Sequence, residues 1–266
     1  MVAVTVRFTK MHGAGNDFVM IDDRAGTFPA DAAHVAALAN RPDGVGCEGV
    51  ILIGKSAKAD FAMRFFNPDG SEAELCGNGA RCVAAFARAI GAVKSPHMRF
   101  ETLAGMIEAE VLDDGRVTVA MPTPKDLRAD FVNSGVPHKI VPVDDLAAAD
   151  VAGEGRRIRY SDEFAPAGTN VDFVRYRPPH ALDIRTYERG VEAETFACGT
   201  GSVAAAVVGV AQHEMSFPVD VRTAGGHILT IGGNFDGTSF SGVTLTGPVR
   251  TVFEGEIRLD SLDMTH

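Results

Sequence analysis

Two short motifs in this sequence place a cysteine directly before a glycine-rich stretch. They are Cys76-Gly77-Asn78-Gly79 and Cys198-Gly199-Thr200-Gly201, and each opens a strongly apolar run. This arrangement predicts a thiol at the N-terminus of a buried helix. Helix N-termini expose unpaired N–H groups and favour negative charge, which lowers a thiol's pKa and also offers a seat for a carboxylate. Each motif therefore predicts a thiol able to act as a base beside an anion site.

The two motifs belong to a longer repeat, in which segments of the first half of the chain match segments of the second half. Four pairs of segments match at a nearly constant offset: Gly15–Asp17 with Gly135–Pro137, Asp69–Glu74 with Arg189–Glu194, Glu101–Ile107 with Arg222–Ile228, and Met121–Pro124 with Leu245–Pro248. The offset of roughly 120 residues is a normal domain size, and it is far longer than a solenoid repeat. We predict a duplication with domains 1–121, carrying Cys76, and 122–266, carrying Cys198. Whether the last residues pack back on the first domain is left open.

Residue periodicity predicts the elements that must position the two motifs. Ten apolar or alternating segments read as strands: 18–21, 50–53, 61–66, 106–111, 117–120, 139–143, 171–176, 182–187, 228–231 and 241–245. Helices are predicted at 32–40 and directly after each cysteine motif. A helix that is apolar almost all round must be enclosed on every side. The predicted fold class is therefore α+β: two pseudo-symmetric domains, each a curved or barrel-like, mostly antiparallel sheet around a central apolar helix.

Composition narrows the class of protein and its partners. The net charge of −10 argues against a nucleic-acid or anionic-membrane surface. No apolar run has the length of a membrane span, and the first residues lack the layout of a signal peptide. Four cysteines in 266 residues do not form a disulfide framework. We expect a cytoplasmic protein that binds a small molecule, with no nucleic-acid or membrane partner.

Two thiols from two related domains suit one particular reaction. Ligand sites commonly form between domains, so Cys76 and Cys198 would flank one ligand. Inverting a carbon centre needs a thiolate that removes the α-proton from one face and a thiol that delivers a proton to the other. The N–H groups after each cysteine would stabilise the charge that develops on the α-carboxylate. The pair therefore predicts acid/base epimerisation of an amino acid.

Other readings of the cysteines were weighed against this one. A buried, inert cysteine is the usual explanation of one such motif, and Cys47 and Cys82 are predicted to be core residues of this kind. Cys76 and Cys82 lack the short spacing of zinc ligands, so no metal site is predicted. A bond between Cys76 and Cys198 is expected only as oxidative damage. No lysine has a context that indicates a pyridoxal Schiff base.

At these residues the chain resembles the diaminopimelate epimerases, which are cofactor-independent amino-acid epimerases. The matching stretches run nearly end to end: Lys10–Phe18, Phe66–Glu72, Cys76–Cys82, Tyr187–Gly190, Ala197–Gly201 and Leu245–Pro248. The resemblance implies two pseudo-symmetric domains, no cofactor, and epimerisation of LL- to meso-diaminopimelate in lysine and peptidoglycan precursor biosynthesis. A homodimer is a further family expectation.

The resemblance also implies roles for individual residues. Cys76 and Cys198 correspond to the catalytic acid/bases, and the α-carboxylate cradle corresponds to Gly77, Asn78, Gly199 and Thr200. The remaining amino and carboxylate groups of the substrate would be bound by Asn16, Asn67, Asn170 and Arg189, with Glu188 beside the reacting amine. His138 and Glu188 would help to set the protonation of the thiols.

Two positions depart from the family pattern. Gly49 stands where many members have Gln, and Val136 stands where many have Asn. These changes keep an alternative open, namely racemisation or epimerisation of another amino acid such as histidine or a proline derivative. An alternative of a different class is a thiol redox or ligand-binding module without turnover.

Overall fold

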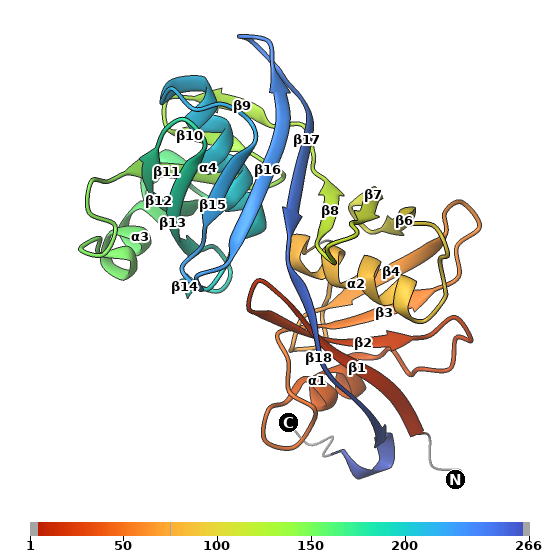
Figure 1. Cartoon of the computed structure of the whole chain (residues 1–266). Helices are drawn as coiled ribbons and strands as arrows, with labels where there is room; N and C mark the ends of the chain where they lie inside the picture. Colours follow the sequence, from red (N-terminus) through yellow and green to blue (C-terminus); the bar gives the residue numbers. More distant parts are fainter. Residues whose placement is uncertain (1–4, 75, 263–266) are drawn as a thin grey trace. The chain divides into compact units, whose positions relative to one another are not determined.

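The computed structural model describes residues 5–74 and 76–262 and divides the chain into two compact units (Figure 1). The first unit is formed by Met1–Val119 together with Val249–His266, and the second by Ala120–Pro248. The second domain predicted from the sequence, 122–266, is thus shortened at its end. The reason is that the final strand, β18 (Val249–Arg258), pairs antiparallel with β1 (Thr5–Gly13) along nearly its whole length.

Each unit consists of many strands and two α-helices. The first unit also contains β2 (Asn16–Asp22), α1 (Ala32–Ala39), β3 (Val50–Gly54), β4 (Phe61–Phe66), β5 (Glu72–Ala73), α2 (Gly77–Ala89), β6 (His97–Thr102), β7 (Gly105–Val111) and β8 (Val117–Ala120). The second contains β9 (Lys125–Arg128), β10 (Phe131–Asn133), β11 (Pro137–Pro142), α3 (Val151–Arg159), β12 (Asn170–Arg177), β13 (Ala181–Glu188), β14 (Ala193–Thr195), α4 (Gly199–Gln212), β15 (Val219–Arg222), β16 (Ile228–Phe235) and β17 (Phe240–Gly247).

The strand pairing of the first unit is repeated in the second. In the first unit β2 pairs parallel with β3, β3 antiparallel with β4, and β4 parallel with β6. In the second, β11 pairs parallel with β12, β12 antiparallel with β13, and β13 parallel with β15. The chain then continues antiparallel through β6–β7–β8 and through β15–β16–β17. The predicted duplication and the mostly antiparallel α+β class are confirmed.

Strand β3 of the first unit is buried on both faces because a helix covers each face. Val50 and Leu52 of β3 lie in an apolar cluster with Val35 and Leu38 of α1. Ile51, between them, points the other way and lies against α2. Successive side chains of a strand alternate between faces, so a strand covered twice reads as a continuous apolar run.

The two motif helices occupy the interior of their units. Helix α2 packs against β1, β2, β3, β7 and β18, and α4 packs against β10, β11, β12, β13, β15, β16 and β17. In α4, Gly199 and every residue from Gly201 to Gly209 are buried. Burial all round explains why α4 lacks a polar stripe. Helix α2 is buried from Asn78 to Ala84, with Arg88 exposed in its last turn, so each unit has the predicted central helix.

All ten predicted strands and all three predicted helices are present, with ends that differ by a few residues. The sequence prediction omitted α3 and the strands β1, β5, β6, β9, β10, β14, β15 and β18. Helix α3 is charged and contains two glycines, which hides its periodicity. It begins at Asp150, whose side chain accepts the N–H of Gly153, and Gly155 lies against Tyr187. Among the described residues, no helix is both long enough and apolar enough to cross a membrane.

Candidate active site

In the first unit, the thiol of Cys76 lies at the entrance to α2. Cys76 is the N-cap residue, with extended backbone, and its side chain is half-buried. Its Sγ donates to Oδ1 of Asn16 at 3.4 Å, and the amide of Asn78 donates to the same oxygen at 3.4 Å. Asn16 is the first residue of β2, so the sheet brings three of the predicted site residues together.

Glycines allow this helix to approach the sheet closely. A Cβ on Gly79 would lie 2.8 Å from Cδ1 of Ile51, and a Cβ on Gly13 would lie 2.9 Å from the carbonyl oxygen of Asn78. Side chains at these positions would push the start of α2 away from β1 and β3. The predicted glycine-rich entry therefore serves packing as well as access to the backbone N–H groups.

Arg81, one turn into α2, is a charged residue that sequence analysis did not select. Its side chain is fully buried and donates to Oδ1 of Asn78 at 2.7 Å and to the carbonyl of Gly77 at 3.2 Å. Burial lowers the pKa of this guanidinium to about 10, while thiolates of Cys82 and Cys76 would raise it. The guanidinium is therefore still cationic at neutral pH, and it orients the amide of Asn78.

Asn67 lies apart from this group in the turn after β4. Its backbone N–H bonds to the carbonyl of Ser71 at 2.8 Å, and its side-chain amide donates to Oγ of Ser71 at 3.0 Å. These contacts describe a turn residue, and the proposed substrate contact of Asn67 rests on the family resemblance.

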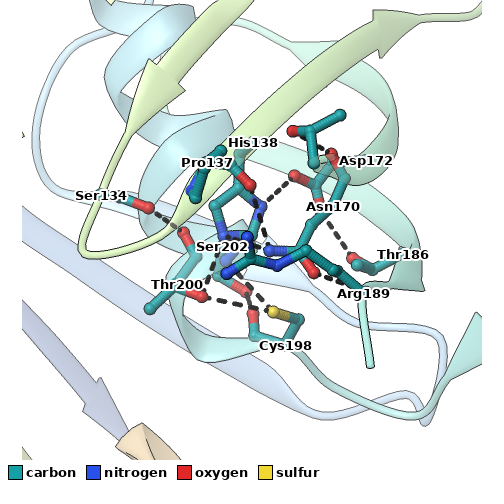
Figure 2. Close-up of polar contacts among 12 residues, drawn as sticks. Ser134, Pro137, His138, Asn170, Asp172, Thr186, Arg189, Cys198, Thr200 and Ser202 are labelled. Atoms are coloured by element: carbon teal, nitrogen blue, oxygen red, sulfur yellow. Dashed lines mark hydrogen bonds and ion pairs between the residues drawn. The ribbon is translucent and has the colours of Figure 1, made fainter. Parts of the chain in front are cut away.

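In the second unit, the thiol of Cys198 lies at the start of α4 and is buried (Figure 2). Its Sγ accepts the backbone N–H of Gly201 at 3.4 Å and lies 3.5 Å from Oγ1 of Thr200. An N–H of the first turn of α4, that of Gly201, thus faces the sulfur, as the motif predicted. Ser202 donates its hydroxyl to the carbonyl of Cys198 at 2.9 Å and fixes the turn.

His138 connects this thiol to a buried carboxylate. Its Nε2 lies 2.9 Å from Oγ1 of Thr200, and its Nδ1 lies 2.7 Å from Oδ2 of Asp172 (Figure 2). Thr186 donates its hydroxyl to the other oxygen of Asp172 at 2.7 Å. The side chains of His138 and Asp172 are entirely inaccessible to solvent. The predicted supporting residue His138 therefore does reach the thiol's immediate surroundings.

Asp172 and Thr186 were not selected from the sequence. The signal was available, because Asp172 interrupts the otherwise apolar run Val171–Val174 of β12. A charge in a strand covered on both faces is almost never left unpaired.

Asn170, Glu188 and Arg189 complete the group in the second unit. Asn170 accepts the backbone N–H of Arg189 at 2.8 Å and donates to the carbonyl of Pro137 at 3.1 Å. These bonds tie β11, β12 and the end of β13 together behind the thiol. The side chains of Glu188 and Arg189 are half-buried, so both carry charge at an accessible edge of the unit.

Burial raises the pKa of the Cys198 thiol well above its ordinary value, and the negative charges of Glu188 and Asp172 raise it further. The hydroxyl of Thr200 and the N–H of Gly201 act in the opposite direction. The isolated thiol is thus a reluctant acid, and its deprotonation needs a proton acceptor nearby.

The structure gives a physical reason for one departure from the family pattern. A Cβ on Gly49 would lie 2.5 Å from the ring of Phe65 and 3.3 Å from the ring of Phe18. With these rings in place, there is no room for a side chain at position 49. All four cysteines are free thiols, and Cys47 and Cys82 are buried core residues.

Comparison with solved structures defines the class of fold. A Bacillus anthracis phenazine biosynthesis protein of the PhzF family matches with a TM-score of 0.73 at 17% identity, covering 96% of this chain and 99% of that one. A hydroxyproline epimerase from Agrobacterium vitis matches with a TM-score of 0.66 at 20% identity, covering 96% and 93%. At this identity, the likeness establishes a shared two-repeat fold.

Sequence comparison then identifies the family. The sequence profile described as Diaminopimelate epimerase matches residues 8–126 and 131–252. A relative of that name from Aquifex aeolicus is 43% identical over 284 residues, covering 97% of this chain and 100% of the relative. Another from Chlorobaculum tepidum is 42% identical over 260 residues, covering 94% and 100%. The chain belongs to the diaminopimelate epimerase family, and the predicted class, an amino-acid epimerase and hence an isomerase, is confirmed.

Proposed function

We propose that this protein interconverts LL- and meso-diaminopimelate by a two-base mechanism in which Cys76 and Cys198 act on opposite faces of one α-carbon. The observation that carries the proposal is the repeated placement of a thiol at the N-terminus of the central helix in each of two duplicated units. One thiolate takes the α-proton, and the other thiol delivers a proton to the opposite face.

The charge that forms in this reaction would be held by the helix starts. When the α-proton leaves, electron density moves onto the α-carboxylate. We assign the binding of that carboxylate to four backbone N–H groups, those of Gly77, Asn78, Gly199 and Thr200. Preorganised donors of this kind stabilise the developing charge without further reorganisation.

The rest of the substrate is assigned to polar residues around the two thiols. Glu188 is suited to the reacting ammonium group, and Arg189 to a carboxylate, because a guanidinium can bind a carboxylate with two hydrogen bonds. Asn16, Asn67 and Asn170 are assigned to the remaining amino and carboxylate groups. In support, Asn16 lies beside Cys76, and the amide of Asn170 lies 3.4 Å from Nε2 of His138.

Solvent isotope exchange tests the reaction directly. Purified, reduced protein in deuterated water should introduce deuterium at the α-carbon of diaminopimelate as the two epimers interconvert, read by mass spectrometry and proton NMR. Absence of exchange under reducing conditions would refute the proposal and favour a redox or ligand-binding module.

A second substrate class is favoured by one observation, the lack of space for a side chain at Gly49. The same exchange measurement with histidine and proline derivatives, in competition with diaminopimelate, separates the two. Preference for another amino acid would leave the two-thiol chemistry standing and replace the substrate.

The working environment and assembly are part of the proposal. We place the enzyme in the reducing cytoplasm, where both thiols stay reduced, and expect a homodimer. Sedimentation of the purified protein tests the dimer.

A further inference from the structure

The second unit contains a continuous line of hydrogen-bonding side chains that ends at Cys198. It runs from Thr186 to Asp172, then to His138, to Thr200 and to the sulfur, with successive separations of 2.7, 2.7, 2.9 and 3.5 Å (Figure 2). Thr186, Asp172 and His138 are buried. We call these four side chains and Cys198 the relay.

The strand registers locate the corresponding positions in the first unit. Asp172 pairs with Thr186 across β12 and β13, as Ile51 pairs with Phe65 across β3 and β4. One residue earlier on β12 and β3, Val171 pairs with Lys139 and Val50 pairs with Val19. His138 therefore corresponds to Phe18, the residue before Val19.

In the first unit these three positions are apolar. Phe18 and Phe65 pack edge to face with ring centroids 6.2 Å apart, and Phe18 and Ile51 are fully buried. The duplicated fold thus accommodates hydrophobic packing at these sites. A buried charged pair at the same positions in the second unit adds little to the stability of the fold, because the desolvation of both groups offsets their attraction. The polar residues of the second unit therefore suggest a chemical role.

We propose that Asp172 is a positioning residue that holds His138 so that the imidazole accepts the proton of Cys198 through Thr200, and that the corresponding apolar positions of the first unit provide no such relay. The inference deepens the proposed function and rests on it for its meaning in catalysis. Its consequence is that the second unit contains a proton acceptor for Cys198 before substrate binds.

The tautomer of His138 follows from its neighbours. The carboxylate of Asp172 accepts, so Nδ1 carries the proton, and Nε2 is left as an acceptor. The amide nitrogen of Asn170 lies 3.4 Å from Nε2 and can donate to it. Asp172 is held in turn by the hydroxyl of Thr186.

The proton transfer balances within the relay. The S–H bond of Cys198 breaks as its proton passes to Oγ1 of Thr200, and the original hydroxyl proton of Thr200 passes to Nε2 of His138. The products are a thiolate and an imidazolium beside the Asp172 carboxylate. The net charge of the site does not change in this transfer. The free-energy cost of forming a buried thiolate is therefore smaller than when Cys198 loses its proton to solvent.

Other charged groups also face the relay. Glu188 and Asp172 act on Cys198 with negative charge, which opposes a thiolate, while the N–H of Gly201 favours it. Around His138 the facing groups are the Asp172 carboxylate, the Asn170 amide and the Thr200 hydroxyl. Because the two charges that raise the pKa of Cys198 are both negative, an imidazolium at His138 would offset them.

The test measures the thiolate of Cys198 without substrate. The full chain with Cys76→Ala is treated with iodoacetamide from neutral to alkaline pH, and peptide mass spectrometry reports the alkylation rate of Cys198. Adding Asp172→Asn or Thr200→Val should slow alkylation at neutral pH by about tenfold or more and move the pH profile by about one unit or more toward alkaline pH. Thr200→Ser keeps the hydroxyl and should restore the profile.

The first unit provides the matching measurement. In a Cys198→Ala background, Asp172→Asn and Thr200→Val should leave the alkylation profile of Cys76 unchanged. Thr230→Val, which removes a hydroxyl bond to the carboxylate of Asp220 elsewhere in the second unit, is a control for general effects on Cys198.

Each outcome decides the proposal. The proposal is overturned if neither Asp172→Asn nor Thr200→Val changes the pH profile of Cys198 alkylation. It is also overturned if these substitutions change the profile of Cys76 equally. If Asp172→Asn fails to fold, Thr200→Val against Thr200→Ser still gives the answer. A shifted profile in a protein that exchanges no α-proton would leave the relay standing and reject the epimerase proposal instead.

Discussion

The guanidinium of Arg81 donates to Oδ1 of Asn78 at 2.7 Å inside the first unit, with the Arg81 side chain fully buried. Asn78 in turn donates to Asn16, whose oxygen also accepts from Cys76. A buried cation thus controls the orientation of an amide next to the thiol of Cys76, the first of the two proposed catalytic thiols. The Cys76 thiol is therefore supported by a cation on its own helix, and the Cys198 thiol by a histidine on a strand.

Removing that cation should disturb Cys76. Arg81→Met removes the hydrogen bond to Oδ1 of Asn78 and a positive charge that favours a Cys76 thiolate. We expect alkylation of Cys76 at neutral pH to slow by about tenfold, and stability to fall by about 1–3 kcal/mol, because a buried charge-assisted hydrogen bond is lost. Mass spectrometry and denaturant unfolding measure the two effects. Arg88→Met, an exposed arginine of the same helix, is the matched control and should change neither.

The two thiols should be individually essential. Cys76→Ala and Cys198→Ala should each reduce the rate of epimerisation by about 10²–10⁴-fold, the usual contribution of a positioned acid or base. The interconversion of LL- and meso-diaminopimelate, followed by chiral chromatography, measures this. Cys47→Ala is the matched control, since Cys47 is a buried core thiol. Near-normal turnover in either single variant contradicts the two-base scheme.

The buried core thiols should make the protein sensitive to alkali. Burial raises the pKa of Cys47 from 9.0 to about 11 and that of Cys82 from 9.0 to about 12. The unfolded chain loses these protons at lower pH than the folded chain. Unfolding is therefore favoured increasingly from about pH 9 upward, by at most about 1.4 kcal/mol per pH unit for each thiol.

Urea unfolding of Cys82→Ala at several pH values measures the contribution of this thiol. The variant should start less stable at neutral pH, because a buried side chain is shortened, and should lose less stability between neutral and alkaline pH than the parent protein. If the free energy of unfolding of the variant falls with pH as steeply as that of the parent, Cys82 does not contribute to the alkali sensitivity.

Helix α3 depends on a glycine that touches the sheet. A Cβ on Gly155 would lie 2.6 Å from Cβ of Tyr187 and 2.8 Å from its Cγ. Gly155→Ala should therefore destabilise the protein by about 1–3 kcal/mol, although alanine is the better helix former. Thermal unfolding measures the change. Ala152→Gly, at an exposed position of the same helix, isolates the effect of helix propensity and should cost about 1 kcal/mol or less.

The duplication, the fold class and the two thiols could be predicted from the sequence alone. These features leave patterns in neighbouring residues: a strand covered on both faces is a continuous apolar run, and a helix enclosed by a sheet is mostly apolar. The Cys-Gly-x-Gly motifs carry their chemistry within four residues. Weak periodicity explains why α3 was not predicted, because Gly153 and Gly155 interrupt a charged segment.

The tertiary structure decided which residues support each thiol. Asp172 and His138 are far apart in the sequence and meet because β11 and β12 pair in parallel, with His138 beside Asn170. Their counterparts Ile51 and Phe18 occupy the same places in the other unit without polar atoms. The charge of Asp172 within an apolar strand is a local signal, but its partner is not, because strand register and cross-strand neighbours, set by packing of the whole unit, determine which side chains meet.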